Sequence, residues 1–289
     1  MKKRGERAQG SVYWILPVVV IAAIILFMFV ILKSVDKVSD EGKKKKIDDA
    51  FSSQGINLRD SGARSLILEC IESGSKESVF KIGLQGGYNS PPERSKEIIE
   101  TFIPYYYYEG EIYMPYLEEV EKEISSYFND NLKNCINNID LEGFTLNYQN
   151  SETKSRIKES YVSFIISLSL NVKKDSILSH IQIDEFQTKI NASIYSSLEI
   201  ADYILESHKE DSELICMSCI KEMADERNLL VEFTNFGGEE DKYTTFVLIS
   251  EKGLSESTPF ELRFLNKYLF NEIAQINIIT DISIQNETL

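Results

Sequence analysis

Hydrophobic residues near the start of the chain form one continuous run, from Trp14 to Leu32, that contains no charged side chain. A helix rises about 1.5 Å per residue, so this run would extend ~28 Å, close to the ~30 Å hydrocarbon core of a bilayer. Tyr13 and Trp14 stand at its beginning, where amphipathic aromatic residues anchor at the headgroups. The pattern predicts a single transmembrane helix over residues 12–32, in contact with membrane lipid from Trp14 to Leu32.

Two later segments show the three- and four-residue spacing of amphipathic helices. The first begins near Ser61 and ends at Gly86-Gly87, and its apolar positions include Cys70. The second follows Pro115 and places its apolar residues on a single stripe, namely Leu117, Val120, Ile124, Tyr127, Phe128, Leu132 and Cys135. Shorter helices are expected over 194–206 and 213–226.

The spacing changes to a period of two after Gly143. Apolar and mostly polar residues alternate from Val162 to Val172, which predicts a long strand with one buried face. A turn at 173–176 leads to an antiparallel partner over 177–186, and further strands are expected over 228–235 and 243–249. The segment 97–111 is expected to be a strand or hairpin that turns at Glu109-Gly110. The fold class predicted is α+β, with an antiparallel sheet and packed helices.

These patterns divide the chain into four parts. Residues 1–11 are a basic N-terminal segment, 12–32 the transmembrane helix, and 33–60 a polar juxtamembrane linker. Residues 61–289 form an acidic α+β ectodomain. The linker assignment depends on the charged stretch Ser34 to Asp49, which shows little apolar periodicity.

Charge and composition exclude several classes of function. The chain has 43% hydrophobic residues, 27% charged residues and a formal net charge of −15. Affinity for a phosphate backbone comes from Lys and Arg, so the balance argues against nucleic-acid binding. Two histidines are too few for a His-rich metal enzyme, and GxSxG, HExxH, Walker A and GxGxxG motifs are absent from the sequence. We therefore expect a non-enzymatic protein with no cofactor and no metal.

Four cysteines form two candidate pairs. Cys70 and Cys135 lie on the apolar faces of two predicted helices, so packing of the helices would bring the thiols together, and the alternative is two buried free thiols. Cys216 and Cys219 form a CxxC, which favours a local disulfide over a thioredoxin-like redox site. A zinc site formed by all four cysteines is a further alternative.

Two further features favour an extracytoplasmic location and a contact surface. An even number of cysteines is typical of an oxidising compartment, and Asn191 and Asn286 open N-glycosylation sequons. Tyrosines are concentrated in one short stretch, and exposed tyrosines are enriched at recognition surfaces, whereas buried ones form an aromatic layer. The candidates for partner contact are Tyr105, Tyr106, Tyr107, Tyr108 and Tyr113.

The segment Lys2-Lys3-Arg4-Gly5-Glu6-Arg7-Ala8-Gln9-Gly10-Ser11 resembles an archaeal prepilin-type leader. The resemblance implies cleavage between Ala8 and Gln9. The fifth residue after that point is commonly Glu in the family and is Tyr13 here, a departure that bears on filament assembly rather than on processing. With Leu84-Gln-Gly-Gly-Tyr88 and Asn131-Leu-Lys-Asn-Cys135, the first 205 residues look like a group of uncharacterised archaeal single-pass proteins with acidic ectodomains.

The resemblance implies a location at the cell surface. We therefore expect a membrane-anchored structural or interaction protein that binds a protein partner or assembles with itself, as a pilin-like subunit or a minor component of surface machinery would. The first alternative is an extracytoplasmic domain that binds a sugar or peptide. The second is an envelope thiol oxidoreductase that acts through Cys216 and Cys219.

Overall fold

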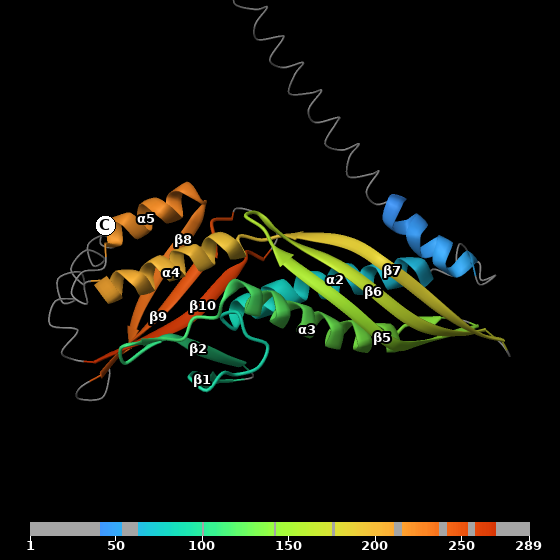
Figure 1. Cartoon of the computed structure of the whole chain (residues 1–289), viewed down its shortest axis with the longest axis horizontal. Coiled ribbons are helices and arrows are strands. Elements are labelled where there is room, and N and C mark those ends of the chain that lie inside the picture. Colours follow the sequence, from blue (N-terminus) through green and yellow to red (C-terminus); the bar gives the residue numbers. More distant parts are fainter. Residues whose placement is uncertain are drawn as a thin grey trace, which may run out of the picture.

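The computed structural model describes residues 41–53, 63–99, 101–141, 143–174, 177–210, 216–236, 242–253 and 258–269. They form the predicted α+β architecture, which consists of two sheets and packed helices around one continuous hydrophobic core (Figure 1). The helices are α2 (Ala63–Leu84), α3 (Leu117–Asn137), α4 (Ile194–Glu210) and α5 (Met217–Glu226). An earlier helix covers residues 41–52.

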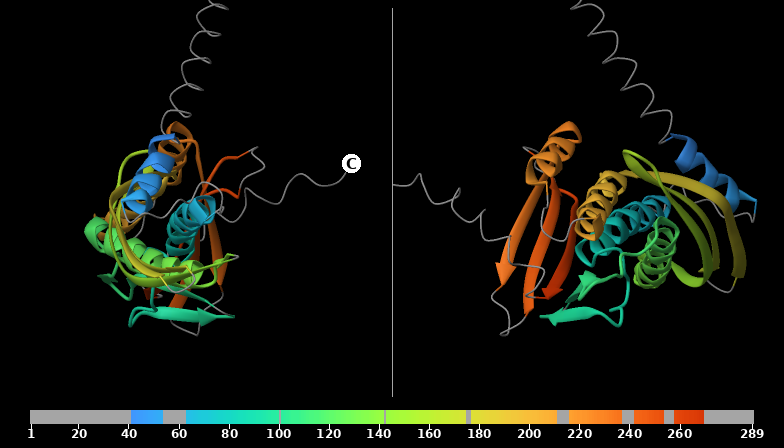
Figure 2. Two further views of the ribbon diagram at one scale, coloured as in Figure 1. Left: turned by 90° about the vertical axis from the view of Figure 1, so that its right-hand side faces the viewer. Right: turned by 60° about the vertical axis from the view of Figure 1, so that its left-hand side comes forward.

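The first sheet is antiparallel and has the strand order β4-β5-β6-β7. Its central strand β6 carries the alternating pattern, and Val162, Phe164, Ile166 and Leu168 are fully buried, as predicted. The long strands curve around α2 and α3, which lie along the inner face of the sheet (Figures 1 and 2). The strands are β4 (Asp140–Leu141), β5 (Phe144–Ile157), β6 (Tyr161–Lys174) and β7 (Ile177–Asn191).

Polar contacts fasten α3 to β5. Glu121 is buried, and its carboxylate accepts hydrogen bonds from the Ile157 amide at 2.9 Å and from Arg156 Nη1 at 2.5 Å. About two turns further along α3, the side-chain oxygen of Asn129 accepts hydrogen bonds from Ser151 Oγ at 2.6 Å and from Thr153 Oγ1 at 2.8 Å. Because buried polar groups need partners, these bonds let a strand with a polar inner face pack against a helix.

The second sheet is mixed, which corrects the expectation of purely antiparallel pairing. Its order is β1-β2-β10-β9-β8, and β3 pairs with β2. Strand β2 runs parallel to β10, with Tyr105 beside Leu265 and Tyr108 beside Lys267. Strands from opposite ends of the domain meet here, so a long crossover connection makes the parallel pairing possible. The strands are β1 (Ser95–Ile98), β2 (Thr101–Tyr108), β3 (Glu111–Ile112), β8 (Leu229–Phe236), β9 (Lys242–Glu251) and β10 (Glu261–Leu269).

The C-terminal end of α2 packs closely on the second sheet. A Cβ at Gly83 would lie 2.5 Å from the Glu261 carbonyl oxygen and 2.5 Å from the Phe260 ring. Gly86 ends the helix with a φ of +56°, and its carbonyl accepts a 3.0 Å hydrogen bond from the buried Tyr106 hydroxyl. Only glycine fits this approach of helix to strand, so the Gly-Gly end of α2 fixes how the two sheets share a core.

The packed domain begins earlier than residue 61. Residues 41–52 form a helix in which Ile47 and Phe51, four positions apart, are both fully excluded from solvent. Lys46 Nζ donates to the Glu185 carbonyl at 2.7 Å, and Arg64 pairs with Asp48 at 2.6 Å. This part of the predicted linker therefore packs on the domain, because a pair of apolar residues is enough to form one buried stripe between charged neighbours.

Within the described residues, no helix is both long enough and apolar enough to cross a membrane. The predicted transmembrane helix from Trp14 to Leu32 lies outside those residues.

Candidate functional site

A disulfide between Cys70 and Cys135 joins α2 to α3, with 1.98 Å between the sulfur atoms. The two helices pack side by side, and the Phe128 ring of α3 lies beside Gly74 of α2. Cys70 is only 3% exposed and Cys135 is half-buried, so this bond lies at the edge of the core. The pairing is the one predicted from the apolar faces of the helices.

The second disulfide joins Cys216 and Cys219 at the start of α5, with 1.95 Å between the sulfur atoms. Cys216 is the N-cap residue of α5, and its sulfur accepts a hydrogen bond from the Cys219 amide at 3.2 Å. Both residues are half-buried, as Cys135 is in the first disulfide, whereas Cys70 is buried. The two bonds together account for all four cysteines of the chain.

The tyrosine stretch lies on β2 and divides between the two faces of the sheet. Tyr106 is fully buried and stacks on Phe264 at a centroid distance of 4.3 Å, and Tyr107 contacts Tyr268 at 5.2 Å. Burial raises the pKa of Tyr106 well above its usual value. These two tyrosines belong to the aromatic core and are not available for partner contact.

The other tyrosines remain half-exposed. Tyr105 and Tyr108 contact each other edge to face at 5.2 Å, on the face of β2 opposite Tyr106. Tyr113 follows β3 and donates a short hydrogen bond to Glu111. We refer to Tyr105, Tyr108 and Tyr113 as the tyrosine surface.

Two cations enclose the ring of Tyr108. The guanidinium of Arg94 lies 4.9 Å from the ring centroid, and Lys267 Nζ lies 4.6 Å from it. Lys267 also pairs with Glu109 at 2.9 Å and donates to the Tyr108 hydroxyl at 3.1 Å. Burial alone would lower the pKa of Lys267, but these hydrogen bonds outweigh it, so that its pKa is raised and it stays charged. Cation–π contacts of this kind hold an aromatic ring in one orientation.

The sequence reasoning did not find Arg94 or Lys267. Lys267 is 159 positions from Tyr108 in the chain and is brought beside it by the parallel β2–β10 pair, and Arg94 is brought beside Tyr108 by the β1–β2 hairpin. The resulting surface combines rigid rings, hydroxyl groups and two ion pairs, Lys267 with Glu109 at 2.9 Å and Arg94 with Glu93 at 3.9 Å. This combination suits recognition of a protein surface, where Tyr and Arg are enriched.

Of the predicted glycosylation and processing positions, the described residues include only Asn191. Asn191 is exposed at the end of β7, where a glycan can be attached. Asn286 and the candidate processing site at Ala8 and Gln9 lie outside the described residues.

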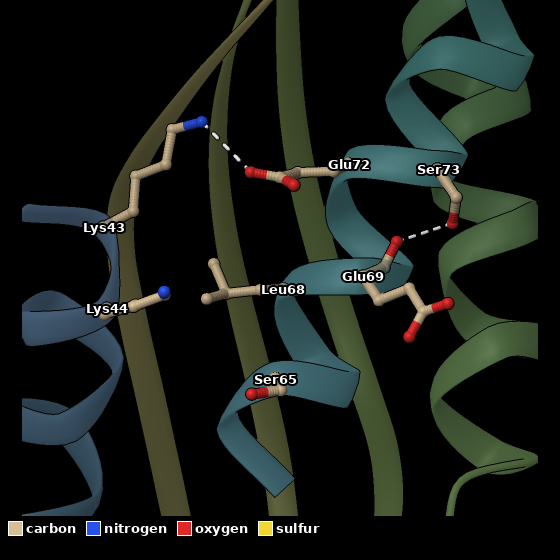
Figure 3. Close-up of a pocket in the computed structure, with 7 residues that line it drawn as sticks. All are labelled: Lys43, Lys44, Ser65, Leu68, Glu69, Glu72 and Ser73. Atoms are coloured by element: carbon tan, nitrogen blue, oxygen red, sulfur yellow. Dashed lines mark hydrogen bonds and ion pairs between the residues drawn. The ribbon is translucent and has the colours of Figure 1, made fainter. Parts of the chain in front are cut away.

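A small cavity of about 340 Å³ separates the helix over 41–52 from α2 (Figure 3). Lys43 and Lys44 point into it from the first helix, and Glu69 and Glu72 belong to α2 (Figure 3). Lys43 is paired with Glu72 at 3.1 Å. Opposite charges therefore face each other across this cavity, which favours a role in docking the helix over a role in binding a ligand.

Metal-ligand clusters of three or more His, Cys, Asp or Glu side chains are absent from the described part of the chain. Comparison with protein-family models, with curated proteins and with solved structures found no match to this chain.

Proposed function

We propose that this protein is a membrane-anchored, extracytoplasmic interaction protein. The observation that carries the proposal is that all four cysteines are paired in disulfides, since such pairs persist in oxidising compartments and are rare in the cytosol. The apolar run from Trp14 to Leu32 supplies the anchor, and the disulfide-linked domain is held outside the membrane.

The tyrosine surface is the proposed contact for a protein partner. It is rigid before binding, because Arg94 and Lys267 hold Tyr108 from two sides and Tyr105 packs against Tyr108. Ordering a side chain on binding costs about 0.5–1.5 kcal/mol, so a surface that is already ordered binds at lower entropic cost.

A narrower form of the proposal makes the protein a pilin-like subunit. It is supported by the prepilin-like residues before Gln9 and by the aromatic start of the apolar run. In this form the anchor helix also packs against the anchors of neighbouring subunits, and processing after Ala8 precedes assembly.

Topology is tested by labelling whole cells of the native host with a membrane-impermeant amine reagent. Exposed lysines of the domain, such as Lys154 at 68% exposure, are expected to be labelled without lysis. Labelling of Lys154 only after lysis would place the domain in the cytoplasm and contradict the proposal.

Partner contact is tested by incorporating a photo-crosslinking amino acid at Tyr105 or Tyr108 in the full chain. Matched positions at Ile165 and Leu178, which are 41% and 67% exposed on the other sheet, serve as controls. We expect a discrete crosslinked product from the tyrosine positions in native membranes and none from the controls. Equal crosslinking at all four positions, or none at the tyrosines, would refute this surface.

A further inference from the structure

A second and larger cavity, of about 760 Å³, lies where the two sheets meet. Its walls come from α2, the end of β7, the loop after α5, and residues 252–253 and 258–259 between β9 and β10. In Figure 1 this is the region where β7 leads into α4. We call it the junction cavity.

Positive charge predominates in the junction cavity although the chain as a whole is strongly acidic. Among the residues that the structure describes, four basic side chains and one acidic side chain, Glu251, line it. The basic residues are Lys76, Lys189, Arg227 and Lys252. In a chain with a formal net charge of −15, such a gathering of basic groups is a local reversal of the field.

The carboxylate of Glu251 is already used by the wall of the cavity. It accepts hydrogen bonds from the Ser193 amide at 2.8 Å and from the Phe260 amide at 3.2 Å. These bonds tie the start of α4 and the start of β10 to β9. The Glu251 carboxylate therefore holds the wall of the cavity together, and it neutralises the basic side chains of the cavity only in part.

The four basic side chains differ in whether they form ion pairs with other carboxylates. Arg227 lies 3.5 Å from Glu199, and Lys252 is hydrogen-bonded to Asp225. Among the described residues, Lys76 and Lys189 have no carboxylate within ion-pair distance. Instead they lie over aromatic rings, Lys76 at 5.6 Å from the Phe80 centroid and Lys189 at 4.7 Å from the Tyr161 centroid.

We infer that the junction cavity binds an anionic, oxygen-rich small molecule, such as a sugar acid or a sugar phosphate. Lys76 and Lys189 would pair with its carboxylate or phosphate, because charge-assisted hydrogen bonds are the strongest that side chains form. Ser160 and Thr258 also line the cavity and offer hydroxyl groups to neutral oxygens of the ligand. The volume lies within the usual range of small-molecule sites, about 300–1,000 Å³.

This inference goes beyond the proposed function and does not depend on it. The cavity is formed by residues within the folded domain, so its ligand would bind whether or not the chain is anchored in a membrane. A failure of the topology test would leave it intact, and a failure of the binding test would leave the tyrosine surface intact.

The test is isothermal titration of the full chain in detergent with glucuronate and glucose 6-phosphate, with glucose as the neutral control and inorganic phosphate as the minimal anion. We expect saturable binding of at least one of the two acidic sugars, no binding of glucose, and weakening as the salt concentration rises. Binding of inorganic phosphate equal to that of glucose 6-phosphate would show that the sugar is not recognised and overturn the assignment to a sugar-sized ligand.

Variants assign the binding to the cavity. Lys76→Ala and Lys189→Ala are each expected to weaken binding about 10-fold, and the double variant about 100-fold. Lys154→Glu is the matched control, because Lys154 is exposed on β5 and paired with Glu152, and it is expected to leave binding unchanged. Lys76→Gln keeps the stem of the side chain should Lys76→Ala fail to fold. Absence of binding for both acidic sugars, or equal binding by the folded double variant, would overturn the inference.

Discussion

The two disulfides should contribute very differently to stability, because they close loops of very different length. Cys70 and Cys135 are separated by 65 positions in the sequence, whereas Cys216 and Cys219 are separated by 3. A crosslink restricts the unfolded chain, and the restriction grows with the logarithm of the loop length. Replacing each pair by alanine therefore removes one crosslink and leaves the other as an internal control.

The loop-entropy relation gives the expected magnitudes. For a separation of 65 the loss is about 4 kcal/mol, and for a separation of 3 it is about 1.6 kcal/mol. Burial adds to the difference, because Cys70 is 3% exposed and its replacement by alanine also removes a buried sulfur atom. In a domain of this size, each kcal/mol corresponds to roughly 2–4 °C in melting temperature.

The assay is urea unfolding of three forms of the full chain in mild detergent, followed by far-UV circular dichroism. The forms are the wild type, the Cys70→Ala/Cys135→Ala double variant and the Cys216→Ala/Cys219→Ala double variant. We expect the first variant to lose the larger free energy of unfolding and to show a steeper denaturant dependence, because its unfolded chain is more expanded. Equal losses in the two variants, or a larger loss at the CxxC, would refute the loop-closure reasoning.

Three further predictions concern single residues. Glu121→Ala should cost about 2 kcal/mol in chemical denaturation, because it leaves the buried amide at the end of β5 without its acceptor, whereas Glu121→Gln should cost less. Gly83→Ala should destabilise by about 1–3 kcal/mol through its clash with β10, and Gly42→Ala, which meets no atom within 4 Å, should have no such cost; thermal melts compare them. Burial raises the pKa of Tyr88 to about 12 and that of Tyr106 well above its usual value, so stability should be retained below pH 10 and lost as the pH rises from 10 to 12. Tyrosinate absorbance at 295 nm should then rise together with the loss of helix, and ionisation of every tyrosine near pH 10 in the folded protein would contradict the burial.

Periodicity identified most of the regular elements. The apolar stripe predicted for α3 is the one that is buried, with Val120, Ile124 and Phe128 fully excluded from solvent. The alternation in β6 was read correctly for the same reason, since each pattern reflects burial of a single face. The turn at Glu109-Gly110 is present too, with φ values of 52° and 100°.

Strand β5 was missed because the inner face of its second half is polar. Thr153 and Ser155 are buried there and donate hydrogen bonds to α3 instead of packing in an apolar layer. Alternation of hydrophobic residues is the signal on which a strand assignment depends, and it is absent where buried hydroxyls meet a partner helix. The partner residues on α3 are 24 and 30 positions away and show no pattern linked to that of β5, so the sequence alone could not reveal the pairing.

The tyrosine surface and the junction cavity also differ in how far the sequence predicts them. The tyrosine stretch could be recognised from its composition, but which tyrosines are exposed depends on the pairing of β2 with β10. The junction cavity had no signal in the sequence, since Lys76, Lys189, Arg227 and Lys252 come from four separate segments. Single lysines in an acidic chain look like ordinary solvated residues until the fold brings them together.

The most direct test of the central claim, an extracytoplasmic domain on a membrane anchor, is the intact mass of the protein extracted from its native membrane and alkylated without reduction. The account predicts a chain with no alkylated cysteine and with its N-terminus at Gln9. A chain that begins at Met1 or Lys2 and carries four alkylated cysteines would contradict it, because the domain would then reside in a reducing compartment and the pilin-like proposal would fail with it.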